Sequence, residues 1–86
     1  MKHKYTKKNV KKVSVKPCAY NLYGKSGKIL RNGSSRDCNR RLNEHRGQFP
    51  GVTTFSTRMT KTWTQAHNIE KAVCKKFNPP FNLKCG

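Results

Sequence analysis

The chain has very few acidic residues. Only 3 of its 86 residues are Asp or Glu, against 20 Lys and Arg, so the formal net charge is +17. A positive charge of this size opposes compaction and attracts polyanions. Nucleic acid is therefore the first expected partner, and an anionic membrane surface is the second.

Long apolar runs are also missing. No stretch approaches the roughly 18 residues of a transmembrane helix, and no apolar core follows the basic N-terminal residues. We therefore expect a cytoplasmic protein with no membrane span and no secretory signal peptide. Charge alone leaves a cationic membrane-active protein as an alternative, but neither predicted helix has the broad apolar face that insertion into a membrane interface requires.

The cysteines show no C-x-x-C pair, which disfavours a zinc site. They are Cys18, Cys38, Cys74 and Cys85. Without a signal peptide, the sequence favours four reduced thiols that pack as small apolar side chains. Disulfide bonds are the remaining alternative.

The first 16 residues contain seven lysines and no acid. Blocks of like charge are usually disordered or loosely attached, so residues 1–16 are predicted to form a flexible basic arm that adds phosphate contacts. Val13 and Val15 alternate with polar neighbours, which also permits a strand to begin there. Residues 17–86 form the folded domain, with room for one small core.

Residues 17–86 predict an α+β fold in the order β-β-α-β-α, with a small three-stranded antiparallel sheet flanked by helices. The predicted elements are a strand at Ala19–Tyr23, a turn at Gly24–Gly27, a strand at Lys28–Asn32, a helix ending near Gly47, a strand at Val52–Met59 and a helix ending near Phe77. Ser35 or Asp37 suits the N-cap of the first helix, and Thr62 or Thr64 suits that of the second.

The helix after the hairpin carries Arg41 and His45, which lie four residues apart and therefore share one face. A guanidinium binds phosphate in a bidentate geometry that lysine lacks, and an imidazole titrates near neutral pH. The pair indicates chemistry on a phosphodiester. The alternatives are a surface ion pair between Arg41 and Asp37, and a histidine that is merely exposed.

Three segments together resemble the GIY-YIG nuclease family. The stretch Asn32–His45 resembles the family's run from its second signature tripeptide into its arginine helix. Gln65–Cys74 is similar to the family's glutamate helix, and Asn78–Asn82 to its closing asparagine region. The resemblance extends from about Cys18 to Asn82, and it implies the GIY-YIG fold and a small divalent-metal-dependent endonuclease.

Both signature tripeptides are incomplete. The first falls on Cys18–Tyr20, where the tyrosine is kept, and the second on Arg31–Gly33, where the glycine is kept and Arg31 replaces the tyrosine. Both tyrosines line the active site in the family. Either Tyr20 therefore activates the attacking water here, or the domain binds nucleic acid without cutting it.

The resemblance implies five catalytic positions: Tyr20, Arg41, His45, Glu70 and Asn82. Arg41 would stabilise charge on the phosphate, and Glu70 would hold Mg²⁺ or Mn²⁺. His45 would position Tyr20 or move a proton, and Asn82 would orient Glu70 or a phosphate. The alternatives are a packed strand tyrosine at Tyr20, an ion pair of Glu70 with a lysine, an arginine or His67, and ordinary turn chemistry at Asn82.

Four further basic residues are predicted to contact the nucleic acid: Lys28, Arg31, Arg36 and Arg40. DNA is favoured over RNA, and contacts to the backbone should make binding strongly dependent on salt. The arginine and glutamate helices look most like those of family members that act as toxins or are carried by mobile elements. That likeness implies an acidic immunity or inhibitor protein as a partner.

Overall fold

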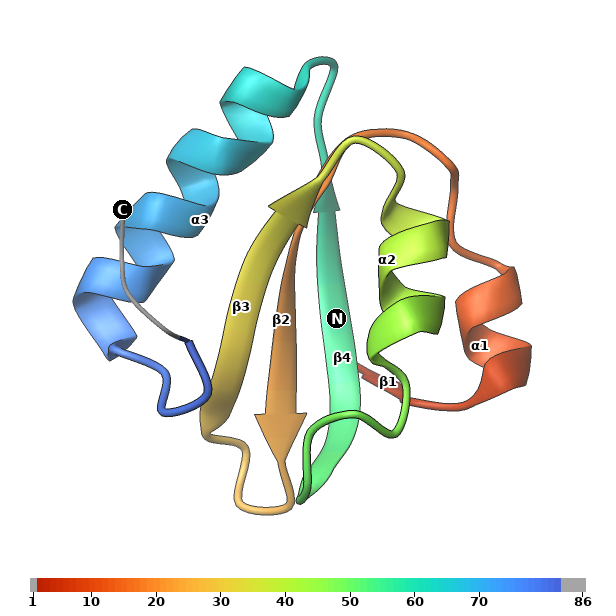
Figure 1. The fold of residues 1–86 in the computed structure, drawn as a ribbon, viewed down its shortest axis with the longest axis vertical. Helices are drawn as coiled ribbons and strands as arrows, with labels where there is room; N and C mark the ends of the chain where they lie inside the picture. Colours follow the sequence, from red (N-terminus) through yellow and green to blue (C-terminus); the bar gives the residue numbers. More distant parts are fainter. Residues whose placement is uncertain (1, 83–86) are drawn as a thin grey trace.

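The computed structural model describes residues 2–82 and contains a four-stranded antiparallel sheet between helices (Figure 1). In chain order the elements are β1 (His3–Lys4), α1 (Lys7–Lys11), β2 (Cys18–Gly24), β3 (Ile29–Ser35), α2 (Cys38–His45), β4 (Val52–Met59) and α3 (Trp63–Phe77). The strands lie in the order β1-β4-β2-β3, so β3 is an edge strand. Helix α3 covers one face of the sheet, and α1 and α2 cover the other (Figure 1). The predicted α+β class is confirmed.

The hairpin of β2 and β3 determines which side chains share a face of the sheet. Tyr20 is paired with Gly33, and Ala19 with Ser34. Because side chains alternate across a strand, Tyr20 and Gly33 face α2, whereas Ala19 and Ser34 face α3. A Cβ atom added at Gly33 would lie 2.7 Å from Cζ of Tyr20. Glycine is therefore required opposite this tyrosine.

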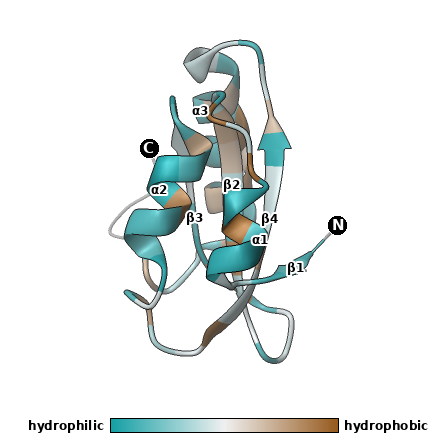
Figure 2. Cartoon of the chain, turned by 90° about the vertical axis from the view of Figure 1, so that its right-hand side faces the viewer, coloured by the Kyte–Doolittle hydropathy of each residue, from teal (hydrophilic) through white to brown (hydrophobic). Residues whose placement is uncertain are grey.

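The apolar core lies between the sheet and the helices α1 and α2. It consists of Val10, Cys18, Tyr20, Leu22, Cys38, Leu42 and Phe55, all of them buried. The outer surfaces of α1 and α2 are hydrophilic, and each helix carries a narrow hydrophobic patch (Figure 2). The other face of the sheet carries Asn21, Asn32 and Ser34, so α3 docks partly through hydrogen bonds.

The helix caps resolve two choices that the sequence left open. Asp37 is the N-cap of α2, and its carboxylate accepts a hydrogen bond from the backbone N–H of Arg40 at 3.0 Å. Thr62 caps α3 in a capping box with Gln65. Both caps satisfy backbone donors that the first helical turn leaves without partners.

The N-terminal segment differs from the predicted loose arm. Strand β1 pairs with β4, which adds a fourth strand to the three expected. Val10 on α1 is fully buried, and the hydroxyl of Tyr5 donates a hydrogen bond to the carbonyl of Leu42. Helix α1, rather than a strand at Val13 and Val15, follows β1. Val10, Tyr5 and Val13 anchor this segment, because their side chains reach the core.

A disulfide bond joins Cys18 at the start of β2 to Cys38 at the start of α2, with a Cα–Cα distance of 5.5 Å. Cys74 on α3 is disulfide-bonded as well. The expectation of four reduced thiols is therefore wrong. Folding brings together two cysteines that are 20 positions apart in the sequence, and spacing alone could not reveal this pair.

Two observations concern the expected location. Within residues 2–82, no helix combines the length and the apolar character needed to cross a bilayer. Disulfide bonds are rare in the reducing cytosol, and with the Cys18–Cys38 bond present the cytoplasmic location stays a prediction.

Candidate active site

The first half of the candidate site lies under α2. Tyr20 from β2 is 1% exposed, and its hydroxyl oxygen lies 3.1 Å from Nε2 of His45, the last residue of α2. Nδ1 of the same ring lies 2.7 Å from Oε1 of Gln48. Because a carbonyl oxygen only accepts, Nδ1 carries the imidazole proton, and Nε2 is left to accept the Tyr20 proton.

Two guanidinium groups act on the Tyr20 hydroxyl, one from Arg31 on β3 and one from Arg41 on α2. Burial raises the pKa of Tyr20 above its ordinary value of 10.0, and both guanidinium groups oppose that rise. Burial also lowers the pKa of His45 below 6.5, and Arg31 and Arg41 lower it further. Near neutral pH the phenol therefore keeps its proton and the imidazole is uncharged.

Arg31 is the residue that the sequence resemblance predicts at the position of the second signature tyrosine. Its Nη1 donates a hydrogen bond of 2.9 Å to the carbonyl of Phe81, and its guanidinium carbon lies 4.8 Å from the ring centroid of Phe49. Arg31 is thus held beside Tyr20, whereas a residue that contacts a nucleic-acid backbone would extend from the surface.

Arg41 does not form the ion pair with Asp37 that was considered from the sequence. Its Nε lies 3.3 Å from Oε1 of Glu44, and the more exposed Arg40 lies 3.8 Å from the same oxygen. Asp37 instead caps α2. The guanidinium of Arg41 also acts on the hydroxyl of Tyr20.

The second half of the candidate site lies under α3, on the opposite face of β3. Oε1 of Glu70 accepts a hydrogen bond of 2.6 Å from the hydroxyl of Ser34 and lies 3.3 Å from Nδ1 of His67. The Glu70 side chain is 25% exposed. The pairing with His67 had been considered as an alternative role for Glu70, whereas the contact with Ser34 was not foreseen.

Asn82 fastens the segment after α3 to the edge of β3. Its Oδ1 accepts from the backbone N–H of Asn32 at 3.0 Å, and its Nδ2 donates to Oδ1 of Asn32 at 2.6 Å. Asn32 in turn donates to the backbone carbonyl of Glu70 at 3.0 Å. Asn82 thus acts on the position of Glu70 through Asn32.

The two halves meet around the outer edge of β3. At this edge the backbone carbonyl of Leu30 accepts a hydrogen bond from the backbone N–H of Phe81, and the backbone N–H of Asn32 donates one to the side chain of Asn82. By alternation, the backbone N–H of Ser34 points to the same edge.

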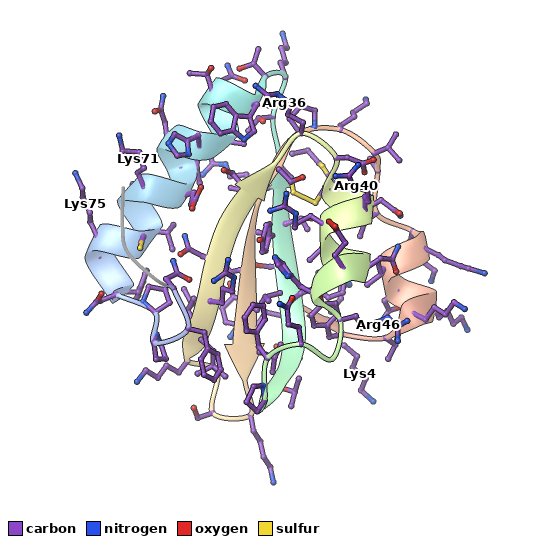
Figure 3. All side chains as sticks on the ribbon, in the orientation of Figure 1. Lys4, Arg36, Arg40, Arg46, Lys71 and Lys75 are labelled. Carbon is purple, nitrogen blue, oxygen red and sulfur yellow. A yellow bond between two sulfur atoms is a disulfide. The ribbon has the colours of Figure 1, made fainter. Side chains whose placement is uncertain are left out.

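Beside that edge lies a depression of about 500 Å³, lined by Ser34, Ser35, Asp37, Trp63 and three arginines, Arg36, Arg40 and Arg41. Figure 3 shows Arg36 and Arg40 at the end of the molecule where α2 begins. Ser34 is the residue that lines this depression and also contacts Glu70.

The predicted site residues therefore form two groups, with one residue apart from both. Lys28 is the residue set apart: it is exposed beside Ile29 and Phe77. It precedes the first residue of β3, whereas Ser34, in the candidate site, lies near the last residue of that strand. Gln48, Ser34 and His67 were not assigned to the site from the sequence. A His-x-x-Glu spacing on α3 was the one signal that could have identified His67.

The residues around Glu70 fit a single divalent cation. Mg²⁺ is commonly bound through one or two carboxylates and keeps several waters. Oε1 of Glu70 contacts Ser34 and His67, and the side chain is 25% exposed, so the carboxylate can reach a hydrated cation. No cluster of three or more His, Cys, Asp and Glu side chains occurs among residues 2–82, so such a cation would have few protein ligands.

Solved structures share this architecture. The GIY-YIG N-terminal endonuclease domain of UvrC from Thermotoga maritima, bound to its catalytic divalent cation, magnesium, matches with a TM-score of 0.78 and 19% sequence identity over 88% of this chain and 93% of that chain. An asparagine-to-alanine mutant of the same domain matches with a TM-score of 0.79 and 18% identity, over 90% of this chain and 93% of that chain. A tyrosine-to-phenylalanine mutant matches with a TM-score of 0.78 and 19% identity, over 88% of this chain and 93% of that chain. No protein-family model and no curated protein matches the sequence. The predicted GIY-YIG fold is confirmed.

Proposed function

We propose that the protein is a small divalent-metal-dependent endonuclease that hydrolyses phosphodiester bonds, with DNA as the first substrate to test. The observation that carries this proposal is the chain of contacts from the Tyr20 hydroxyl through His45 to Gln48. It provides a proton path beside two arginines, on a fold shared with an endonuclease domain.

Tyr20 is the residue that activates the attacking water. Its hydroxyl passes its proton to Nε2 of His45 and takes one from water. The charges of Arg31 and Arg41 stabilise the transient phenolate, since both groups oppose the rise in the pKa of Tyr20. Oε1 of Gln48 accepts from Nδ1–H of His45 and steadies the imidazolium that forms.

The phosphate is held at the outer edge of β3. Arg41 stabilises the charge that develops on the phosphoryl oxygens, and Arg36 and Arg40 contact flanking phosphates from the same depression. A divalent cation at Glu70 supplies Lewis-acid stabilisation of the phosphate and the leaving oxygen when bound. Ser34 holds the Glu70 carboxylate in place for that cation.

Target choice rests on backbone electrostatics. The net charge of +17 attracts any nucleic acid, and cations such as Arg46, Lys71 and Lys75 are spread over both helical layers (Figure 3). The same charge supports an acidic inhibitor as a partner if the protein acts as a toxin.

Nicking of supercoiled plasmid at low salt tests the proposal. We expect the protein to nick with Mg²⁺ or Mn²⁺ and to stop with EDTA. Glu70→Gln should lower the rate by about 10³-fold or more, because it removes the carboxylate ligand of the cation. Asn68→Ala is the control, since it changes an exposed side chain on the same helix and leaves the carboxylate in place.

Binding measured in parallel separates the two candidate functions. If the wild type and Glu70→Gln bind plasmid equally and neither nicks it with any cation, the protein is a non-catalytic nucleic-acid-binding domain on the same fold.

A further inference from the structure

His67 has no part in the proton path, yet it lies against the carboxylate that the proposed function assigns to the cation. His67 and Glu70 are three residues apart on α3 and share one face of the helix. Nδ1 of His67 lies 3.3 Å from Oε1 of Glu70. Their side chains are 31% and 25% exposed, so both are reachable from solvent.

The orientation of the His67 ring is set by Trp63. The two rings are stacked with their centroids 4.7 Å apart and an interplanar angle of 15°. The guanidinium of Arg36 lies 4.9 Å from the centroid of Trp63. Stacking on the indole fixes the imidazole plane and directs the Nδ1 edge to Glu70.

The spacing of these atoms suits two ligands of one metal ion. Ligands at 2.0–2.2 Å from a metal lie about 2.8–3.1 Å from each other in octahedral geometry and about 3.3–3.6 Å in tetrahedral geometry. The distance between Nδ1 of His67 and Oε1 of Glu70 is 3.3 Å. The hydroxyl of Ser34, 2.6 Å from the same oxygen, also restrains the carboxylate.

We infer that His67 and Glu70 together ligate the divalent cation, and that the imidazole nitrogen makes the site prefer first-row transition-metal ions to Mg²⁺. Mg²⁺ prefers oxygen ligands and loses its waters reluctantly. Imidazole suits later transition metals, whose affinities rise from Mn²⁺ through Co²⁺ to Ni²⁺. This inference rests on the proposed role of Glu70 and adds a second protein ligand.

Tryptophan fluorescence provides a measure of binding that is independent of activity. Trp63 is the only tryptophan in the chain and stacks on His67, so paramagnetic Mn²⁺ or Ni²⁺ bound at His67 should quench its emission. The intact, disulfide-bonded protein is titrated with each ion, and Mg²⁺ is added as a competitor. We expect Ni²⁺ to bind more tightly than Mn²⁺, and Mn²⁺ more tightly than Mg²⁺.

His67→Phe keeps an aromatic ring against Trp63 and removes the ligand. It should weaken Ni²⁺ binding by at least about tenfold and leave the affinity for Mg²⁺ within about threefold. His3→Phe removes a histidine that lies against Phe55 on another part of the fold, and should change neither affinity. If circular dichroism shows that His67→Phe is unfolded, His67→Gln takes its place.

The possible failures can be told apart. Unchanged Ni²⁺ affinity in the folded His67 variant overturns the assignment of His67, even if nicking continues. Quenching that requires His67, in a protein that nicks with none of these ions, supports the metal site and overturns the nuclease.

Discussion

The two faces of β3 hold the two halves of the candidate site in contrasting surroundings. On the α2 face, Tyr20 is buried in the apolar core, and burial keeps both it and His45 uncharged near neutral pH. On the α3 face, Glu70 is partly exposed and sits among hydrogen-bonding side chains. Apolar surroundings suit groups that exchange a proton, and polar surroundings suit a carboxylate that binds a hydrated cation.

The position of β3 at the edge of the sheet explains how the two halves can act on one phosphate. A central strand would keep its two faces apart with neighbouring strands on both sides. Phe81 and Asn82 contact this edge at Leu30 and Asn32. Under the proposed function, a phosphate further along the edge, beside Ser34, would meet Arg41 from one face and a cation at Glu70 from the other.

The largest expected effect that separates the two halves is that of Tyr20→Phe. Loss of the hydroxyl removes the group that takes the proton from water, so the nicking rate should fall by about 10²–10⁴-fold. The affinity for Mn²⁺, measured by quenching of Trp63, should stay the same because the α3 face is untouched. A rate within tenfold of the wild type would exclude Tyr20 as the water-activating residue.

A smaller effect is expected from Asn82→Ala on the α3 face. This change breaks the link through Asn32 to the backbone of Glu70, so Mn²⁺ affinity and nicking should both fall by about 10–100-fold. Asn68→Ala, at an exposed position on the same helix, is the control. A loss of nicking without a loss of affinity would show that Asn82 acts on the phosphate instead.

The smallest effect is the pH dependence contributed by His45. Because the pKa of His45 is lowered in the folded protein, the imidazole is neutral at pH 7 and nicking should be flat there. The rate should fall only below pH 6.5, by about tenfold per pH unit once the imidazole is protonated. A rate profile of the wild type beside His45→Gln, which should lack this fall, tests the assignment.

Folding stability should change in the same direction. Between the lowered pKa of folded His45 and its ordinary value of 6.5, the unfolded chain binds more protons than the folded one, so stability falls as the pH decreases. Denaturant midpoints at several pH values separate this loss of stability from the loss of catalysis. A rate that falls together with the folded fraction would indicate unfolding alone.

Local signals in the sequence were sufficient for most secondary structure. Val52–Met59 is a strand with the predicted bounds, and the hairpin and both later helices follow from turn residues and N-caps. Strand β1 and the burial of Val10 were missed because they depend on residues far along the chain. The lysines around Val10 made its segment look like a solvated arm.

The candidate site divides in the same way. Spacing along α2 was enough to place Arg41 and His45 on one face, and the family resemblance indicated Tyr20, Glu70 and Asn82. The contact of Ser34 with Glu70 has no local signature, because the two residues are 36 positions apart and only folding brings them together. Gln48 and His67 each lie three residues from their partners, but that spacing alone does not distinguish a site from an ordinary surface contact.

The order of the elements from β2 onward can be read from the chain alone, as can the residue types for proton transfer, phosphate binding and cation binding. These depend on near neighbours and side-chain chemistry. The pairing of Cys18 with Cys38, the place of Arg31 beside Tyr20 and the separation of Glu70 from His45 by β3 cannot be read from the chain alone. These features depend on strand register and helix packing, which are set by contacts between residues distant in the sequence.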